Sequence, residues 1–205
     1  MIIALPGIKD NEYPPVLKNT AMLTTMYHMM STTEGQYDWV LKVDDDTLVN
    51  FNGFQFLSKL NPIIQKLYLG QQGMGDADKG DEGNMGLAKP FCMGGPGYII
   101  SRAALNIVGP TLSQCARSKM LIKDHDRSWH SDVIVGKCMW EKVHVGCWDS
   151  SVSAVVQYRP FRRFFHKYAQ ADWLSGRKLA EAATLHPLKS PALMRMMYEK
   201  LRGVN

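Results

Sequence analysis

Apolar residues recur along the chain at two spacings, which separate predicted helices from predicted strands. From Val16 onward they return mostly every three or four residues, which predicts an amphipathic helix. Its expected apolar face holds Leu17, Ala21, Met22, Met26, Met29 and Met30. The same spacing near the end predicts a helix over residues 191–201, with a face of Leu193, Met194, Met197 and Leu201.

Short apolar runs bounded by turn residues predict strands at residues 2–5, 39–43, 67–69, 98–100 and 143–145. Further helices are predicted over 54–60, 102–108 and 132–140, with Ser101 as the N-cap of the second. A glycine-rich loop is expected over 70–86, and residues 151–183 follow no clear pattern. Because strands alternate with helices, the sequence predicts an α/β fold in one continuous domain, residues 1–205.

The composition narrows the class of protein without fixing its function. The 205 residues are 45% hydrophobic and 21% charged, which excludes a disordered chain, a collagen and a small disulfide scaffold. No apolar run approaches the ~18 residues that a membrane-spanning helix needs, so no such helix is predicted. The net charge of +5 suits a phosphate-bearing or acidic substrate but does not require one.

Three consecutive carboxylates, Asp44, Asp45 and Asp46, follow the apolar run at 39–43. Like charges this close are costly unless a counter-charge is present, and a divalent cation prefers carboxylate oxygens. Strand alternation would turn Asp44 and Asp46 to one face and Asp45 to the other. Acidic residues capping a strand in solvent remain an alternative. A calcium loop does not fit, because Val49 stands where its glycine is needed.

With its flanks, this triplet resembles the metal-binding strand of the β-1,3-glycosyltransferases, which include the Fringe proteins and the core 1 galactosyltransferases. Later blocks follow in that family's order, and the resemblance is strongest to the N-terminal, Fringe-like domain of chondroitin synthases. The blocks are Leu69-Gly70-Gln71, Phe91-Cys92-Met93-Gly94-Gly95-Pro96-Gly97, His130-Ser131-Asp132-Val133 and Leu185-His186-Pro187-Leu188-Lys189.

The resemblance implies a GT-A-type fold, with a mixed central sheet flanked by helices. It implies an enzyme, an inverting, metal-dependent hexosyltransferase that moves a sugar from a UDP-sugar to a glycan or glycoprotein acceptor. A β-1,3 linkage and chondroitin-type glucuronosyl transfer are favoured. Asp44, Asp46 and His186 would bind Mn²⁺ or another divalent metal, and Asp45 would support the loop and take part in donor or acceptor binding. Asp132 would be the general base, although Ser131 stands where the family often has a second acid.

Other residues take their expected roles from the same resemblance. Gly94, Gly95 and Gly97 would let the backbone approach a donor or acceptor sugar, and Lys189 would assist with the diphosphate. The four cysteines lack zinc-type spacing. The family's secretory location implies disulfides, and the core 1 enzymes favour the pairs Cys115–Cys138 and Cys92–Cys147.

The match to the family begins only near Ala4, which leads to an expectation of an N-terminally truncated domain without its first nucleotide-binding strand or a membrane anchor. A full-length version would be a type II membrane protein of the Golgi lumen, and homo- or hetero-oligomers with related glycosyltransferases are considered. No nucleic-acid partner is expected. The alternatives are a non-catalytic glycosyltransferase-like partner or sugar-binding protein and, more remotely, a metal phosphatase based on Asp44 and Asp46.

Overall fold

A computed structural model describes residues 5, 7–8, 15–32, 36–73, 91–121, 130–148, 164–166 and 182–203 of the chain. The predicted strand at 2–5, apart from Leu5, lies outside the described residues. So do most of the glycine-rich loop and most of residues 151–183.

The centre of the fold is a three-stranded antiparallel sheet in the order β1 (Trp39–Lys42), β6 (Tyr98–Ser101) and β3 (Tyr68–Gly70). Successive side chains of a strand point to opposite faces. Tyr98 and Ile100 therefore enter one hydrophobic core, while Ile99 between them enters another. Both faces of this sheet are consequently covered.

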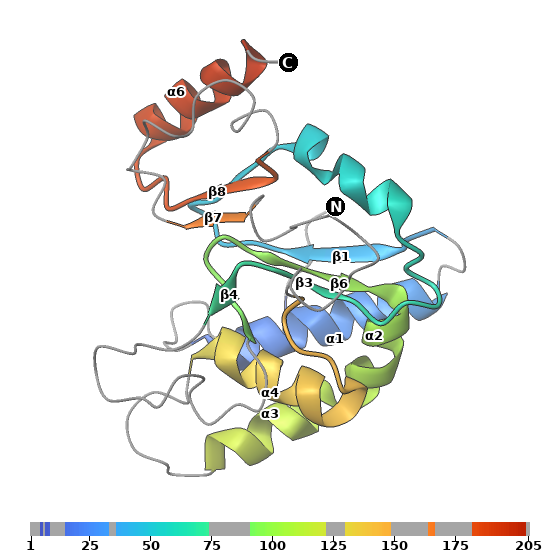
Figure 1. The fold of residues 1–205 in the computed structure, drawn as a ribbon. Helices are drawn as coiled ribbons and strands as arrows, with labels where there is room; N and C mark the ends of the chain where they lie inside the picture. Colours follow the sequence, from blue (N-terminus) through green and yellow to red (C-terminus); the bar gives the residue numbers. More distant parts are fainter. Residues whose placement is uncertain are drawn as a thin grey trace.

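Helices cover one face, and a 3₁₀ helix covers the other (Figure 1). On the first face, one hydrophobic core joins the sheet to α1 (Val16–Thr32), α2 (Arg102–Val108), α3 (Leu112–Leu121) and α4 (Ser131–Val143), and α3 packs against α1 and α4. The opposite face packs against η1 (Phe51–Lys59), whose Phe56 is fully buried. A short 3₁₀ turn, η3 (Gly109–Thr111), joins α2 to α3.

Two smaller sheets adjoin this centre. In one, β8 (Thr184–His186) lies between β2 (Leu48–Val49), which is antiparallel to it, and β7 (Phe164–His166), which is parallel to it. The other pairs β4 (Gln72–Gly73) with β5 (Phe91–Cys92). The amphipathic helix α6 (Pro191–Arg202) packs Met197 and Leu201 onto the β8 region. The predicted apolar face of this helix is confirmed.

The mixed α/β class is confirmed, but the described residues form three small sheets instead of one mixed central sheet. Mixed pairing occurs only in the β2-β8-β7 sheet among them. The prediction for α2 is correct in both bounds and cap, since the Ser101 side chain accepts from the Ala104 amide. The predicted strand at 143–145 is wrong: α4 continues to Val143 and ends at His144, whose backbone is left-handed.

The helix predicted from Val16 is present, but its predicted apolar face is mostly wrong. The buried positions are Val16, Asn19, Thr20, Leu23 and Met30, so the buried stripe includes two polar residues. The Thr20 hydroxyl is satisfied by the Val16 carbonyl within the helix. The Asn19 side chain accepts a hydrogen bond from the Tyr98 hydroxyl in the sheet. Tertiary contacts therefore rotate α1 away from the face that its methionines suggest.

Candidate functional site: an acidic turn, a histidine and a glycine turn

The three acidic residues lie in a turn at the end of β1. The strand ends at Lys42, and the turn is closed by a hydrogen bond from the Thr47 amide to the Asp44 carbonyl, 3.2 Å long. Asp45 is exposed, while Asp44 and Asp46 are partly buried. A turn, and not continued strand alternation, therefore separates Asp45 from its two neighbours.

The strand β8 delivers His186 to this turn from the far end of the chain. Pairing of β8 with β2, which follows the turn directly, fixes the approach. A backbone hydrogen bond of 2.8 Å from the Leu188 amide to the Asp46 carbonyl fixes it further. As a result, His186 Nε2 lies 3.1 Å from Asp46 Oδ1, with only 12% of the histidine side chain exposed.

Asp44, Asp46 and His186 form a three-ligand cluster. One ligand atom from each lies within 4.8 Å of the other two. Burial lowers the pKa of His186 below its usual value, against the opposing effect of Asp46 and Asp44. The imidazole is therefore neutral at neutral pH, which is the form that binds a metal. Two carboxylates and one neutral imidazole are a suitable donor set for Mn²⁺ or a similar divalent cation.

The turn formed by Gly94, Gly95, Pro96 and Gly97 packs directly against this cluster. A Cβ at Gly95 would lie 2.4 Å from His186 Cε1. Gly97 has a φ of +89°, and a Cβ there would lie 2.6 Å from the Lys42 carbonyl oxygen. The Thr47 hydroxyl donates to the Gly95 carbonyl at 2.7 Å. These glycines thus make room for other parts of the protein, whereas the sequence suggested only room for a sugar.

Gly94 joins the acidic turn to Asp132. Its carbonyl accepts a 3.1 Å hydrogen bond from Lys42 Nζ, which also forms an ion pair with Asp44. Its amide donates to Asp132 Oδ2 at 2.8 Å. The other oxygen of Asp132 accepts from the Val133 amide at 2.9 Å. Asp132 lies in the first turn of α4, where the helix dipole favours an acidic residue.

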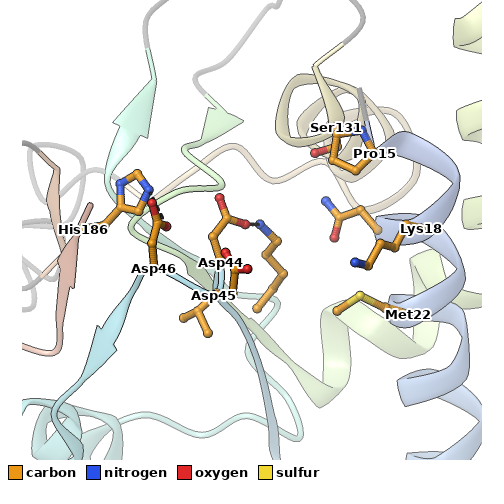
Figure 2. A pocket seen from close by; sticks show the side chains of 11 residues that line it. Pro15, Lys18, Met22, Asp44, Asp45, Asp46, Ser131 and His186 are labelled. Carbon is orange, nitrogen blue, oxygen red and sulfur yellow. Dashed lines mark hydrogen bonds and ion pairs between the residues drawn. The ribbon is translucent and has the colours of Figure 1, made fainter. Parts of the chain in front are cut away.

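A cavity of about 530 Å³ opens beside the acidic turn (Figure 2). One wall is formed by the turn and His186, and α1 forms the other. Ser131 also lines the cavity, whereas its neighbour Asp132 does not; Asp132 is connected to the lining residue Lys42 through hydrogen bonds with Gly94. The lining residues are Pro15, Lys18, Asn19, Met22, Lys42, Val43, Asp44, Asp45, Asp46, Ser131 and His186.

A family model described as Fringe-like matches residues 15–153, which is more than half of the chain and contains the acidic turn, the glycine turn and Asp132. The chain belongs to the Fringe-like family. A second model, described as Chondroitin N-acetylgalactosaminyltransferase, matches residues 122–205 of this Fringe-like chain.

Similarity to known proteins extends along nearly the whole of this Fringe-like chain. Chondroitin sulfate synthase 3 of Mus musculus is 34% identical over 195 residues, which cover 93% of this chain and 20% of that protein. The Homo sapiens protein of the same name gives the same values. Human Chondroitin sulfate glucuronyltransferase is 27% identical over 187 residues, 89% of this chain and 21% of the relative. The chain spans about a fifth of the length of these relatives.

Two disulfides support the Fringe-like fold around the site. Cys92 pairs with Cys147, and Cys115 pairs with Cys138, which are the pairs expected from the resemblance. The first bridge anchors β5, two residues before Gly94. The second joins α3 to α4, the helix that begins with the Asp132 turn.

Three lining residues of this Fringe-like site, Lys42, Lys18 and Asn19, were not predicted from the sequence. Lys42 could have been found, because it is a charged residue in an apolar strand two positions before Asp44. Lys18 and Asn19 gave no signal, since they lie within the helical pattern of α1. Lys189 is exposed and does not line the cavity. Its charge still helps to lower the pKa of His186, but burial and the charge of Lys42 have larger lowering effects.

Among the described residues of this Fringe-like chain, no helix has the length and apolar character needed to cross a membrane.

Proposed function

We propose that this chain carries the site of an inverting, metal-dependent glycosyltransferase, which moves a sugar from a UDP-sugar to a glycan acceptor. The β-1,3 transfer of glucuronic acid to a chondroitin-type chain is favoured, because the relatives are named for chondroitin synthesis and glucuronyl transfer. One observation carries the proposal: the Asp44, Asp46 and His186 cluster lies on the wall of a cavity of about 530 Å³. That volume is within the range of about 300–1,000 Å³ typical of small-molecule sites.

The metal role is assigned to Asp44, Asp46 and His186. When bound there, a divalent cation such as Mn²⁺ would supply Lewis-acid charge to neutralise the leaving diphosphate. The protein itself would hold these three ligand side chains together. The Leu188–Asp46 backbone bond and the close contact between Gly95 and His186 support this role, because both hold the imidazole against the acidic turn.

The general-base role is assigned to Asp132, because inversion in one step requires a group that takes the acceptor hydroxyl proton. The amides of Gly94 and Val133 orient its carboxylate. A carboxylate oxygen accepts more than one hydrogen bond, so each oxygen keeps capacity for the acceptor hydroxyl. Ser131 lines the cavity immediately before Asp132, which supports entry of the acceptor from this side.

The remaining assignments are more general. Asp45, Lys189 and the backbone of Gly94, Gly95 and Gly97 are proposed to contact donor or acceptor. The two disulfides support a Golgi-lumen location, because disulfides persist in oxidising compartments. Oligomerisation with related glycosyltransferases stays a prediction.

Calorimetric titration of the chain with UDP in the presence and absence of Mn²⁺ tests the proposal. We expect Mn²⁺-dependent UDP binding that Asp46→Ala abolishes. The matched control is Asp38→Asn. It removes the carboxylate immediately before the first residue of β1, where Asp38 pairs with Arg102. Equal UDP affinity in wild type and Asp46→Ala would overturn the metal role.

A transfer assay separates an enzyme from a non-catalytic relative. UDP-glucuronic acid is offered with a chondroitin oligosaccharide that ends in GalNAc, and UDP-galactose and UDP-GlcNAc follow as donors. Transfer that is lost in Asp46→Ala would support the enzyme. Mn²⁺-dependent UDP binding without transfer to any acceptor would favour the sugar-binding or partner role instead.

A further inference from the structure

The α1 wall of the cavity differs in chemistry from the wall that faces it. Figure 2 shows Pro15, Lys18 and Met22 on one side and the acidic turn with His186 on the other. Four residues line this wall: Pro15, which precedes α1, and Lys18, Asn19 and Met22 of α1. Lys18 and Asn19 are the polar ones. Neither residue belongs to the cluster assigned to the metal.

Asn19 lines this cavity and has an unused hydrogen-bond donor. The residue is 3% exposed, and its Oδ1 accepts a 3.3 Å hydrogen bond from the Tyr98 hydroxyl. Burial raises the pKa of Tyr98 far above its usual value, so the hydroxyl keeps its proton and remains a donor. The Asn19 Nδ2 finds no hydrogen-bond partner in the part of the chain that the structure describes. A buried amide in this state is costly unless a ligand accepts from it.

The polar groups of this wall are all hydrogen-bond donors. An ammonium has three donors and no acceptor, and the only side-chain acceptor of Asn19 is already engaged by Tyr98. A sugar hydroxyl both donates and accepts, so it would not use the wall fully. A carboxylate is an acceptor only, and it also complements the positive charge of Lys18. The wall therefore favours an anionic, acceptor-only group.

We propose that Lys18 and Asn19 bind the carboxylate of a uronic acid on the donor nucleotide, and so select UDP-glucuronic acid over UDP-glucose. This inference rests on the proposed function, since it assigns the diphosphate to the opposite wall and the sugar to α1. Tyr98 acts as a positioning residue, because its hydroxyl engages Asn19 Oδ1 and so leaves Nδ2 as the donor that remains for the ligand.

The test compares the Mn²⁺-dependent affinities of UDP, UDP-glucose and UDP-glucuronic acid by calorimetry. Wild type should prefer UDP-glucuronic acid over UDP-glucose by about 10-fold or more, as expected for hydrogen bonds to a charged group. Lys18→Met and Asn19→Ala should each reduce this preference severalfold and leave UDP affinity unchanged. Asn19→Asp should reduce it further, because it places a negative charge near the carboxylate.

Lys142→Met is the matched control, because it removes one positive charge from an exposed site on α4 outside the cavity. Lys18→Met changes a partly exposed side chain, so it tests the inference even if the Asn19 variants fail to fold. An unchanged preference in Lys18→Met would overturn the inference. A loss of UDP affinity as large as the loss of UDP-glucuronic acid affinity would also overturn it, because the wall would then contact the nucleotide or the diphosphate. Wild type that binds no UDP would instead overturn the proposed function, and this inference with it.

Discussion

Gly95 and His186 are in such close contact that a methyl group does not fit between them: a Cβ at position 95 would lie 2.4 Å from the imidazole Cε1. The two residues are 91 positions apart in sequence, yet the contact sets where the imidazole can lie relative to Asp46. The glycine turn is thus part of the cluster's geometry.

We expect Gly95→Ala to displace the His186 ring. Overpacking should lower the free energy of unfolding by about 1–3 kcal/mol. Mn²⁺-dependent UDP affinity should fall about 10–100-fold, as is typical when the support of a metal ligand is disturbed. Thermal unfolding and calorimetry measure the two effects.

Gly203→Ala is the control, because a Cβ there meets nothing closer than 3.6 Å. If Gly95→Ala bound UDP and Mn²⁺ as wild type does, the contact between the glycine and the histidine would have no bearing on the metal site.

Asp132→Asn should reduce sugar transfer about 10²–10⁴-fold, because the amide cannot take the acceptor hydroxyl proton. UDP affinity should change little, since donor binding is assigned to the acidic turn. The new NH₂ group will face the amide of Gly94 or Val133, so a loss of about 1–3 kcal/mol in stability is also expected. Initial rates and calorimetry well below the unfolding temperature check both expectations.

Asp46→Asn is the comparison for this variant, since it should weaken both transfer and UDP binding. Retention of more than about a tenth of wild-type turnover in Asp132→Asn would argue against the base role. Asp124 and Asp126, which lie outside the described residues, would then be the next candidates.

The two disulfides should differ in what their removal costs. Cys92–Cys147 spans 55 residues and Cys115–Cys138 spans 23. Loop-closure entropy predicts losses of about 4 and about 3 kcal/mol when each pair is changed to serine. Peptide mapping without reduction, on protein made in an oxidising compartment, should recover both pairs, and denaturant unfolding gives the order of stability. A peptide that links Cys92 to Cys115 would contradict the pairing.

Stability should decline above about pH 10, in part through Tyr98. Burial raises the pKa of its hydroxyl in the folded state, and Asp132 and Asp44 add to the shift, while the hydrogen bond with Asn19 lowers it. The proton is therefore held more tightly when folded. The stabilisation is complete below the unfolded pKa of about 10 and is lost as the pH rises above it.

Tyr98→Phe removes one hydroxyl group that holds its proton more tightly in the folded state than in the unfolded state. Its unfolding free energy should fall less steeply between pH 10 and 11.5 than that of wild type, by at most about 1.4 kcal/mol per pH unit. The buried Tyr68, whose pKa is also raised, keeps part of the slope in the variant. Parallel pH profiles of the two proteins would show that Tyr98 ionises as easily in the fold as outside it.

The elements whose signals are local could be predicted from the sequence. The helix α2 and its Ser101 cap follow from a hydroxyl placed directly before an apolar helical run. The strand β1, the acidic triplet behind it and the amphipathic face of α6 likewise depend on neighbouring residues alone. The cysteine pairs came from resemblance to a family and not from spacing.

Which distant residues share the site depends on the fold and could not be predicted from local sequence. The three-residue strand β8 carries too few residues to be predicted by periodicity, and it forms because β2 and β7 pair with it. That pairing brings His186 to Asp46. The buried face of α1 was also misjudged, because Asn19 is polar and its burial depends on a hydroxyl 79 residues away, on Tyr98. A polar side chain can be buried only where a partner satisfies it, and that partner is specified by the fold, not by the neighbouring sequence.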